Sequence, residues 1–249
     1  MFTLARYELY RLFLSPLAWI ILALSQLILA YLFLTHIDYF MQIQAKISAI
    51  PGAPGVTELI AIPLLSNAAT IFLLITPLIT MRLIAEERRN DSLPLLISAP
   101  LSIHQIVLGK YLATFGFFLV LLTLLMLMPL SLLMGSAIDL YMLAASFLGL
   151  VLLLASFTAI GLFLSSLTKQ PAIAAITTFT TLFLLWIIDW AGNSQTGEQD
   201  SLFSWLSLLR HFEPMLQGEI HSSDISYYLI IIVTFLLLTI RHLDSERIN

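Results

Sequence analysis

The stretch RLIAEERRNDSLPLLISAPLSIHQIVLGKY, residues 82–111, decides how this chain folds, because it separates two long apolar segments. It carries four of the eleven Lys and Arg residues of the chain. Residues 59–81 before it and 111–138 after it are almost free of charge, and each run is long enough to cross about 30 Å of hydrocarbon as a helix. We therefore expect a charged, water-facing segment between two membrane-spanning helices.

The first half of this segment has a helical pattern. Glu86 and Arg89 stand three residues apart, which allows a short solvated helix to form its own charge pairs. Asp91 or Ser92 can cap a second turn that tolerates Pro94 near its start. The apolar surface of that turn is expected to come from Leu93, Leu95, Leu96 and Ile97.

The second half predicts a new helix. Pro100 ends the preceding turn, and Ser102 with Gln105 has the spacing of a capping box that opens a helix. That helix should run through Lys110 into the next apolar run. The whole segment, residues 82–110, is therefore expected to lie across the membrane surface between two spans.

Composition places the chain among integral membrane proteins. It is 59% hydrophobic and 10% charged with a mean hydropathy of +0.98, whereas soluble domains carry roughly 25% charged residues. The net charge of −4 gives no reason to expect a nucleic-acid partner. The absence of cysteine excludes disulfides, a thiolate nucleophile and a thiolate-bound metal.

Apolar runs and loop signals divide the chain into a single six-span unit, residues 1–249. The fold class is all-α polytopic membrane protein, with an interfacial helix at residues 1–14 on which Phe2, Leu9 and Phe13 share an apolar face. Ser15 and Pro16 then start the first span. The six spans are predicted at residues 17–34, 59–81, 111–134, 141–167, 172–188 and 225–240.

Two loops are expected on the side opposite the charged segment. Residues 36–58 hold Lys46 and the PGAPG run 51–55, which is typical of a loop. Residues 189–224 form a longer polar loop with an amphipathic stretch. One face of that stretch is predicted to hold Leu202, Trp205, Leu206, Leu209, Phe212 and Leu216.

The distribution of basic residues predicts the orientation. With six spans, nine Lys and Arg residues fall on the side of the two termini and the charged segment, and only Lys46 and Arg210 fall on the other. Because basic loops stay in the cytoplasm, both termini and residues 82–110 are expected to be cytoplasmic in a multi-pass inner-membrane protein.

A search for catalytic or metal-binding patterns finds none in the sequence. The five histidines are scattered without HxxxH or HExxH spacing, so we predict no metal site. Gly109 and Lys110 lack the upstream glycine and the following hydroxyl of a P-loop, so the chain is expected to bind no nucleotide by that means. If ATP is used, another subunit must bind it.

Polar side chains inside the spans give candidate pathway residues. Asn67 and Thr70 on the second span, with Thr177 and Thr181 on the fifth, could line a polar route. Helix-to-helix hydrogen bonding is the alternative and is favoured for any one of them. No charge lies deep in a predicted span, which disfavours a proton-coupled carrier.

The order of these elements resembles the permease subunit of ABC-2 type transporters, and is most similar to the gliding-motility (GldF-like) branch. The resemblance covers essentially the whole chain and rests on Arg6-Tyr7-Glu8-Leu9, Ser15-Pro16-Leu17-Ala18, residues 82–100 with Gly109-Lys110, and Leu209-Arg210-His211-Phe212-Glu213. Similar sequences tend to have glycine where this one has Asp91, and an acidic residue where it has Pro94.

The resemblance implies a mechanism without catalytic residues in this chain. Two permease subunits, as a homodimer or heterodimer, would form the pathway, and cytoplasmic ATPase subunits would bind ATP and Mg²⁺ and push on the segment. The coupling residues implied are Glu86, Glu87, Arg88, Arg89, Leu93, Leu95, Leu96 and Pro100, the leucines seated in the ATPase cleft. Membrane lipids and an accessory extracytoplasmic protein are further expected partners.

Three other classes remain. A secondary carrier needs intramembrane charges and an intramembrane enzyme needs paired catalytic side chains at bilayer depth, and the sequence shows neither. A membrane scaffold needs neither feature, so it stays open. Copurification of an ATPase would separate these classes from the transporter. The sequence does not choose among lipid-linked, peptide and polysaccharide substrates, and export is expected only because it predominates in the family.

Overall fold

The computed structural model describes residues 2–47, 54–92, 102–193 and 205–248. Over these residues the chain is helical and contains no strand. The elements in order are α1 Phe2–Leu14, α2 Pro16–Ile47, the π-helix η1 Thr57–Ala61, α3 Ile62–Thr80, α4 Ala85–Arg89, α6 Ile103–Ser131, the 3₁₀-helix η2 Leu132–Met134, α7 Leu140–Ser166, α8 Pro171–Asn193, α10 Leu208–Leu216 and α11 Ser222–Ile248.

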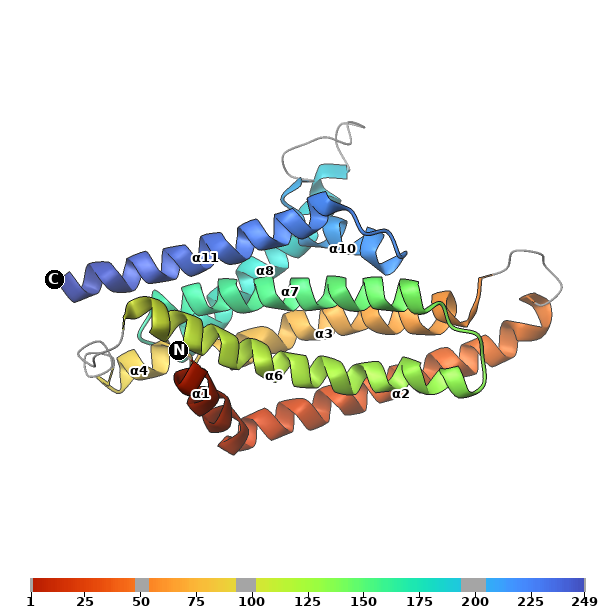
Figure 1. Ribbon diagram of the computed structural model, residues 1–249, viewed down its shortest axis with the longest axis horizontal. Helices are drawn as coiled ribbons and strands as arrows, with labels where there is room; N and C mark the ends of the chain where they lie inside the picture. Colours follow the sequence, from red (N-terminus) through yellow and green to blue (C-terminus); the bar gives the residue numbers. More distant parts are fainter. Residues whose placement is uncertain (1, 48–53, 93–101, 194–204, 249) are drawn as a thin grey trace.

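Six of these segments are long and apolar enough to cross a membrane, which confirms the predicted all-α, six-span fold. Figure 1 shows them as an elongated bundle, with α1, α4 and the C-terminus towards the left of the view. The candidate spans in the described residues are Pro16–Gln44, Thr57–Arg89, Ile103–Met134, Leu140–Ser166, Pro171–Ile188 and Ser222–Glu246.

Local sequence signals start several of these helices. The Ser102 hydroxyl accepts from the Gln105 backbone N–H while the Gln105 side chain accepts from the Ser102 N–H, so the predicted capping box at α6 is confirmed. Asp139 caps α7 by accepting from the backbone N–H groups of Tyr141 and Met142. Pro16 stands first in α2, where its missing N–H costs nothing.

Helix α7 forms the centre of the bundle. It packs against α3, α6, α8, α10 and α11, and most of its residues are buried. Its contact with α3 is especially close, because a Cβ at Gly161 would overlap the side chain of Thr80. By contrast, α2 and α8 expose most of their apolar surface, as expected for helices that face lipid or a second protein.

Two local features differ from the sequence expectations. Helix α2 continues to Ile47, so the segment expected to be a loop from residue 36 is helical to that point. In the second polar loop, α10 begins after Ser207, whose hydroxyl accepts from the Arg210 N–H. This start changes the register in part: Trp205 and Leu206 are exposed rather than on the buried face, whereas Phe212 and Leu216 are buried as predicted. Leu209 is half-buried, Leu202 lies outside the described residues, and the buried face is completed by Leu208, His211 and Met215.

Candidate functional site

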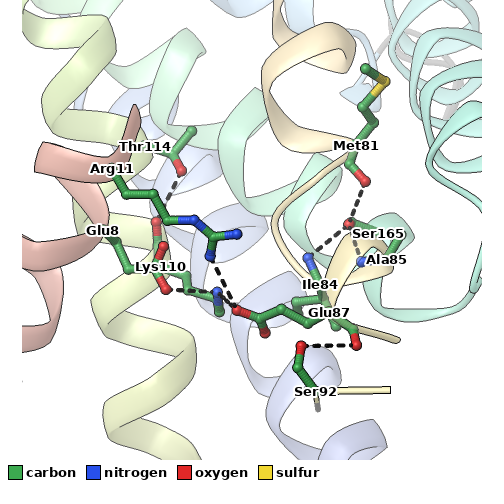
Figure 2. A network of polar contacts seen from close by, with 10 residues as sticks. All are labelled: Glu8, Arg11, Met81, Ile84, Ala85, Glu87, Ser92, Lys110, Thr114 and Ser165. Atoms are coloured by element: carbon green, nitrogen blue, oxygen red, sulfur yellow. Dashed lines mark hydrogen bonds and ion pairs between the residues drawn. The ribbon is translucent and has the colours of Figure 1, made fainter. Parts of the chain in front are cut away.

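The short helix α4 is attached to α7 at its start. The hydroxyl of Ser165 accepts from the backbone N–H groups of Ile84 and Ala85, both at 3.2 Å, and donates to the carbonyl of Met81 at 3.1 Å (Figure 2). The first N–H groups of a helix have no partner of their own, and α4 has no capping side chain from its own segment. A buried serine from the central helix therefore supplies the cap.

The end of α4 is defined by a backbone motif. The N–H of Ser92 bonds the carbonyl of Glu87 at 3.0 Å, and the N–H of Asp91 bonds that of Arg88 at 3.3 Å, which is the Schellman pattern. Asp91 adopts φ 51°, the left-handed conformation that favours glycine. Asp91 therefore occupies the position after the helix end that glycine fills most often in proteins.

A buried ion network joins α4 to α1 and α6. The Nζ of Lys110 lies 2.9 Å from Oε1 of Glu8 and 2.6 Å from Oε1 of Glu87, and Lys110 is only 1% exposed (Figure 2). Arg11 stands 3.9 Å from the same oxygen of Glu87. Two cations thus balance two carboxylates, which offsets the cost of removing these charges from water.

The network arises from the close approach of α1 to α6. Gly109 precedes Lys110, and a Cβ at Gly109 would lie 2.9 Å from a methyl carbon of Leu4. The missing side chain lets α1 pack closely on α6, with Glu8 facing Lys110 (Figure 2). The Thr114 hydroxyl donates to the Lys110 carbonyl within α6, so this buried hydroxyl has a hydrogen-bond partner.

Helix α11 makes the remaining attachment. A terminal nitrogen of Arg88 lies 2.7 Å from Oε2 of Glu246 and 3.3 Å from Nε2 of His242. The Nε of Arg88 and the Oε2 of Glu87 are buried without a hydrogen-bond partner in the described part of the chain. Helix α4 is therefore joined to α1, α6, α7 and α11, but its charged groups are not fully satisfied.

Comparison with known proteins identifies the family of the chain as a whole. Residues 41–189, more than half of the chain, match the family model described as ABC-2 family transporter protein. The chain belongs to the ABC-2 transporter family. It is thus a multi-pass membrane component of a transporter, and members of this family generally imply an ATPase partner and a dimeric arrangement. The match does not support the narrower gliding-motility assignment, and no curated protein matches the chain.

The predicted coupling residues of this ABC-2 protein divide into two groups. Glu87 and Arg88 point into the chain and bind other helices, a role that the sequence analysis did not predict. Arg89 is exposed and Glu86 is half-buried, and neither forms the helix-internal charge pair expected from their spacing. Leu93, Leu95, Leu96 and Pro100 lie outside the described residues, and their role stays a prediction.

The candidate pathway residues lie on two helices. The Asn67 side-chain nitrogen is 3.2 Å from Nε2 of His36 on α2, so it makes a helix-to-helix contact. Thr70 is exposed, and the exposed Thr177 donates to the carbonyl of Ile173 within its own helix. Thr181 is half-buried. The Asn67 contact matches the alternative of helix-to-helix hydrogen bonding, whereas the Thr177 bond stays within its own helix.

The sequence analysis missed the members of the site that come from other helices. Glu8 is separated from Lys110 by 102 residues, and Ser165 stands 80 residues from Ala85. One signal was present: Lys110 directly adjoins an apolar run, and a cation there needs an acidic partner. Among the described residues no group of three or more His, Cys, Asp or Glu is placed to hold a metal ion.

Proposed function

We propose that this chain is the permease subunit of an ATP-driven exporter, and that α4 with the residues after it receives the force from a separate cytoplasmic ATPase. In this proposal two permease subunits form the pathway in the inner membrane, with both termini cytoplasmic. ATP and Mg²⁺ are bound by the ATPase. The observation that carries the proposal is that a five-residue helix between two spans is attached to four other helices.

The attachments support coupling for a mechanical reason. Lys110 joins α4 to α1 and α6, Ser165 joins it to α7, and Arg88 joins it to α11. A push on α4 would therefore move these helices together, as rigid-body domain motions require. If residues 82–110 were only a solvated loop, Lys110 would be expected to face water. It is instead 1% exposed and paired with two carboxylates.

The residues available to an ATPase follow from the inward orientation of Glu87 and Arg88. Arg89 is exposed on α4 and stands next to the segment that holds Leu95 and Leu96. We propose that the leucines enter the ATPase cleft and that Arg89 orients the contact. Glu87 and Arg88 then transmit the movement rather than touch the partner.

The test is purification of the tagged full-length chain in mild detergent from its native host. Mass spectrometry of the bound proteins and an ATPase assay on the complex identify the partner. We expect a stoichiometric P-loop ATPase whose association is lost in the Leu95→Asp, Leu96→Asp double variant and weakened in Arg89→Glu. Lys169→Glu, at an exposed site in another loop, is the matched control and should retain the ATPase.

Purification without any nucleotide-binding partner would contradict the proposal. A membrane scaffold or a secondary carrier would then account better for the six spans. Retention of the ATPase by the double variant and by Arg89→Glu would leave a transporter but place the docking site elsewhere on the chain.

A further inference from the structure

A pocket of about 160 Å³ lies beside the ion network, where α1 meets the start of α2 and the end of α3. The pocket adjoins α4, because Glu86 of that helix is one of its lining residues. Its residues come from α1, the turn at Ser15, the start of α2, the end of α3, the connection to α4, α4 itself, and α6.

The pocket has an apolar part and a charged part. The apolar residues are Leu12 of α1, Leu17 and Ala18 at the start of α2, Leu78 near the end of α3, and Phe117 of α6. The charged residues are Glu8, Arg11, Arg82, Glu86 and Lys110. A lipid at the membrane surface likewise has an apolar part in the hydrocarbon and a polar headgroup in water. The two parts of the pocket therefore match the two parts of an amphiphilic molecule.

Two arginines of the pocket are available to an anionic group. Three cations and two carboxylates line the pocket, and Glu87, which is not among the lining residues, lies against Lys110 and Arg11, so the charges at this place balance. Lys110 is held by Glu8 at 2.9 Å and Glu87 at 2.6 Å, whereas neither arginine makes so short a contact with a carboxylate of the described residues. Arg82 is exposed and forms no ion pair with any residue that the structure describes, and Arg11 is 52% exposed with its nearest carboxylate at 3.9 Å.

We propose that this pocket binds one anionic glycerophospholipid of the adjacent leaflet. Its phosphodiester lies between the guanidinium groups of Arg11 and Arg82, which suit phosphate because their planar donors can bind two oxygens at once. The acyl chains leave the pocket along Leu17 and Leu78. Since Arg11 also approaches Glu87, the lipid adjoins the residue that holds α4.

This lipid site goes beyond the proposed function and does not depend on it. A headgroup held by α1 and the α3–α4 connection adds a link to the one that the ion network makes between α1 and α4. Each basic residue near an anionic surface contributes roughly 1 kcal/mol of attraction, so two arginines give selectivity over an uncharged lipid.

The experiment is native mass spectrometry of the full-length chain in detergent, with dioleoyl phosphatidylglycerol, dioleoylglycerol or inorganic phosphate added. The unchanged chain should retain one phosphatidylglycerol and no dioleoylglycerol, and inorganic phosphate should not compete. In the Arg11→Gln, Arg82→Gln double variant, retention should fall by about tenfold or more, since hydrogen bonds to charged groups are worth about 1.5–3 kcal/mol.

Two control variants show whether the charge of the pocket is the cause. Arg241→Gln removes an exposed arginine outside the pocket and should bind phosphatidylglycerol as before. Arg11→Lys, Arg82→Lys keeps both charges and should retain most of the binding, which also excludes misfolding as the cause of the loss. Equal binding by the Gln double variant, equal binding of dioleoylglycerol, or displacement by inorganic phosphate would each overturn the proposal.

Discussion

Helix α7 carries a short helix near each of its ends, and the two are attached in different ways. Near its start, α10 packs on Gly149 and lies against the buried Ser146, whose hydroxyl is 3.2 Å from the Leu216 carbonyl. Near its end, Ser165 holds α4. The two serines are about 30 Å apart along the helix.

The interactions at the two sites differ in kind. Three side chains of α10, Leu208, Phe212 and Met215, are fully buried, and His211 binds Asp224 at 2.7 Å. Helix α4 instead depends on ion pairs through Lys110 and Arg88. Close packing specifies one position, whereas ion pairs are lost when one partner is removed and are weakened by salt where they are exposed. We therefore expect α10 to be held on α7 mainly by packing and α4 to be held mainly by charge.

The largest effect is expected from removing the central cation of the α4 site. Lys110→Met leaves Glu8 and Glu87 facing each other in a buried place, and breaking a buried pair costs about 3–5 kcal/mol. The free energy of unfolding in mixed micelles should fall by that amount. Lys169→Met, at an exposed site, should change it by less than about 0.5 kcal/mol. Equal losses in both variants would show that the ion network is not stabilising.

A slightly smaller loss is expected at α10. Phe212→Ala removes a fully buried ring and should lower the free energy of unfolding by about 3 kcal/mol through the cavity it leaves. Leu206→Ala, at a position 41% exposed, should cost well under half as much. If the two variants were equally stable, α10 would not be held by packing, and the comparison with α4 would fail.

The close contact of α10 with α7 gives a third test. A Cβ at Gly149 would lie 3.0 Å from Cβ of Met215 and 3.2 Å from a ring carbon of Phe212. Gly149→Ala should therefore destabilise the protein by about 1–2 kcal/mol, as overpacking does. Gly135→Ala has open space around it and should be close to neutral in the same unfolding measurement. A neutral Gly149→Ala would mean that α10 can shift on α7.

The smallest effect on stability should come from the link between α4 and α11. Arg88→Gln breaks the pair with Glu246, which is one-third exposed, so the expected loss is about 1 kcal/mol and shrinks as salt is added. Arg89→Gln, the adjacent and exposed residue, should leave the free energy of unfolding unchanged. A salt-independent loss, or equal losses in the two variants, would speak against an ionic attachment.

The sequence predicted the six-span fold because long apolar runs and helix caps such as Ser102 are local signals. It did not predict the register of α10, because that helix begins only after its cap, Ser207. Trp205 and Leu206 precede the cap, so they do not belong to the helix and do not share its buried face. The ion network also escaped prediction. Its members are far apart in sequence, and only the crossing of α1 over α6 brings Glu8 to Lys110.

The most direct test of the account asks whether α4 and α1 move together when the ATPase binds ATP. The chain has no cysteine, so spin labels can be placed at exposed positions without removing native residues. The positions are Asn90→Cys at the end of α4, Tyr10→Cys on α1, and Met134→Cys, which is 97% exposed, at the far end of α6. Distances are measured in the complex with and without a non-hydrolysable ATP analogue.

The account predicts that the distance between the labels on α4 and α1 stays constant to within about 2 Å when the analogue binds. The distance from the α4 label, or from the α1 label, to the label at residue 134 of the partner permease should change by more than about 2 Å. In Lys110→Met the distance between α4 and α1 should change when the analogue binds, because the link is lost. A change of the distance between α4 and α1 in the chain with Lys110 intact would contradict coupling through the ion network.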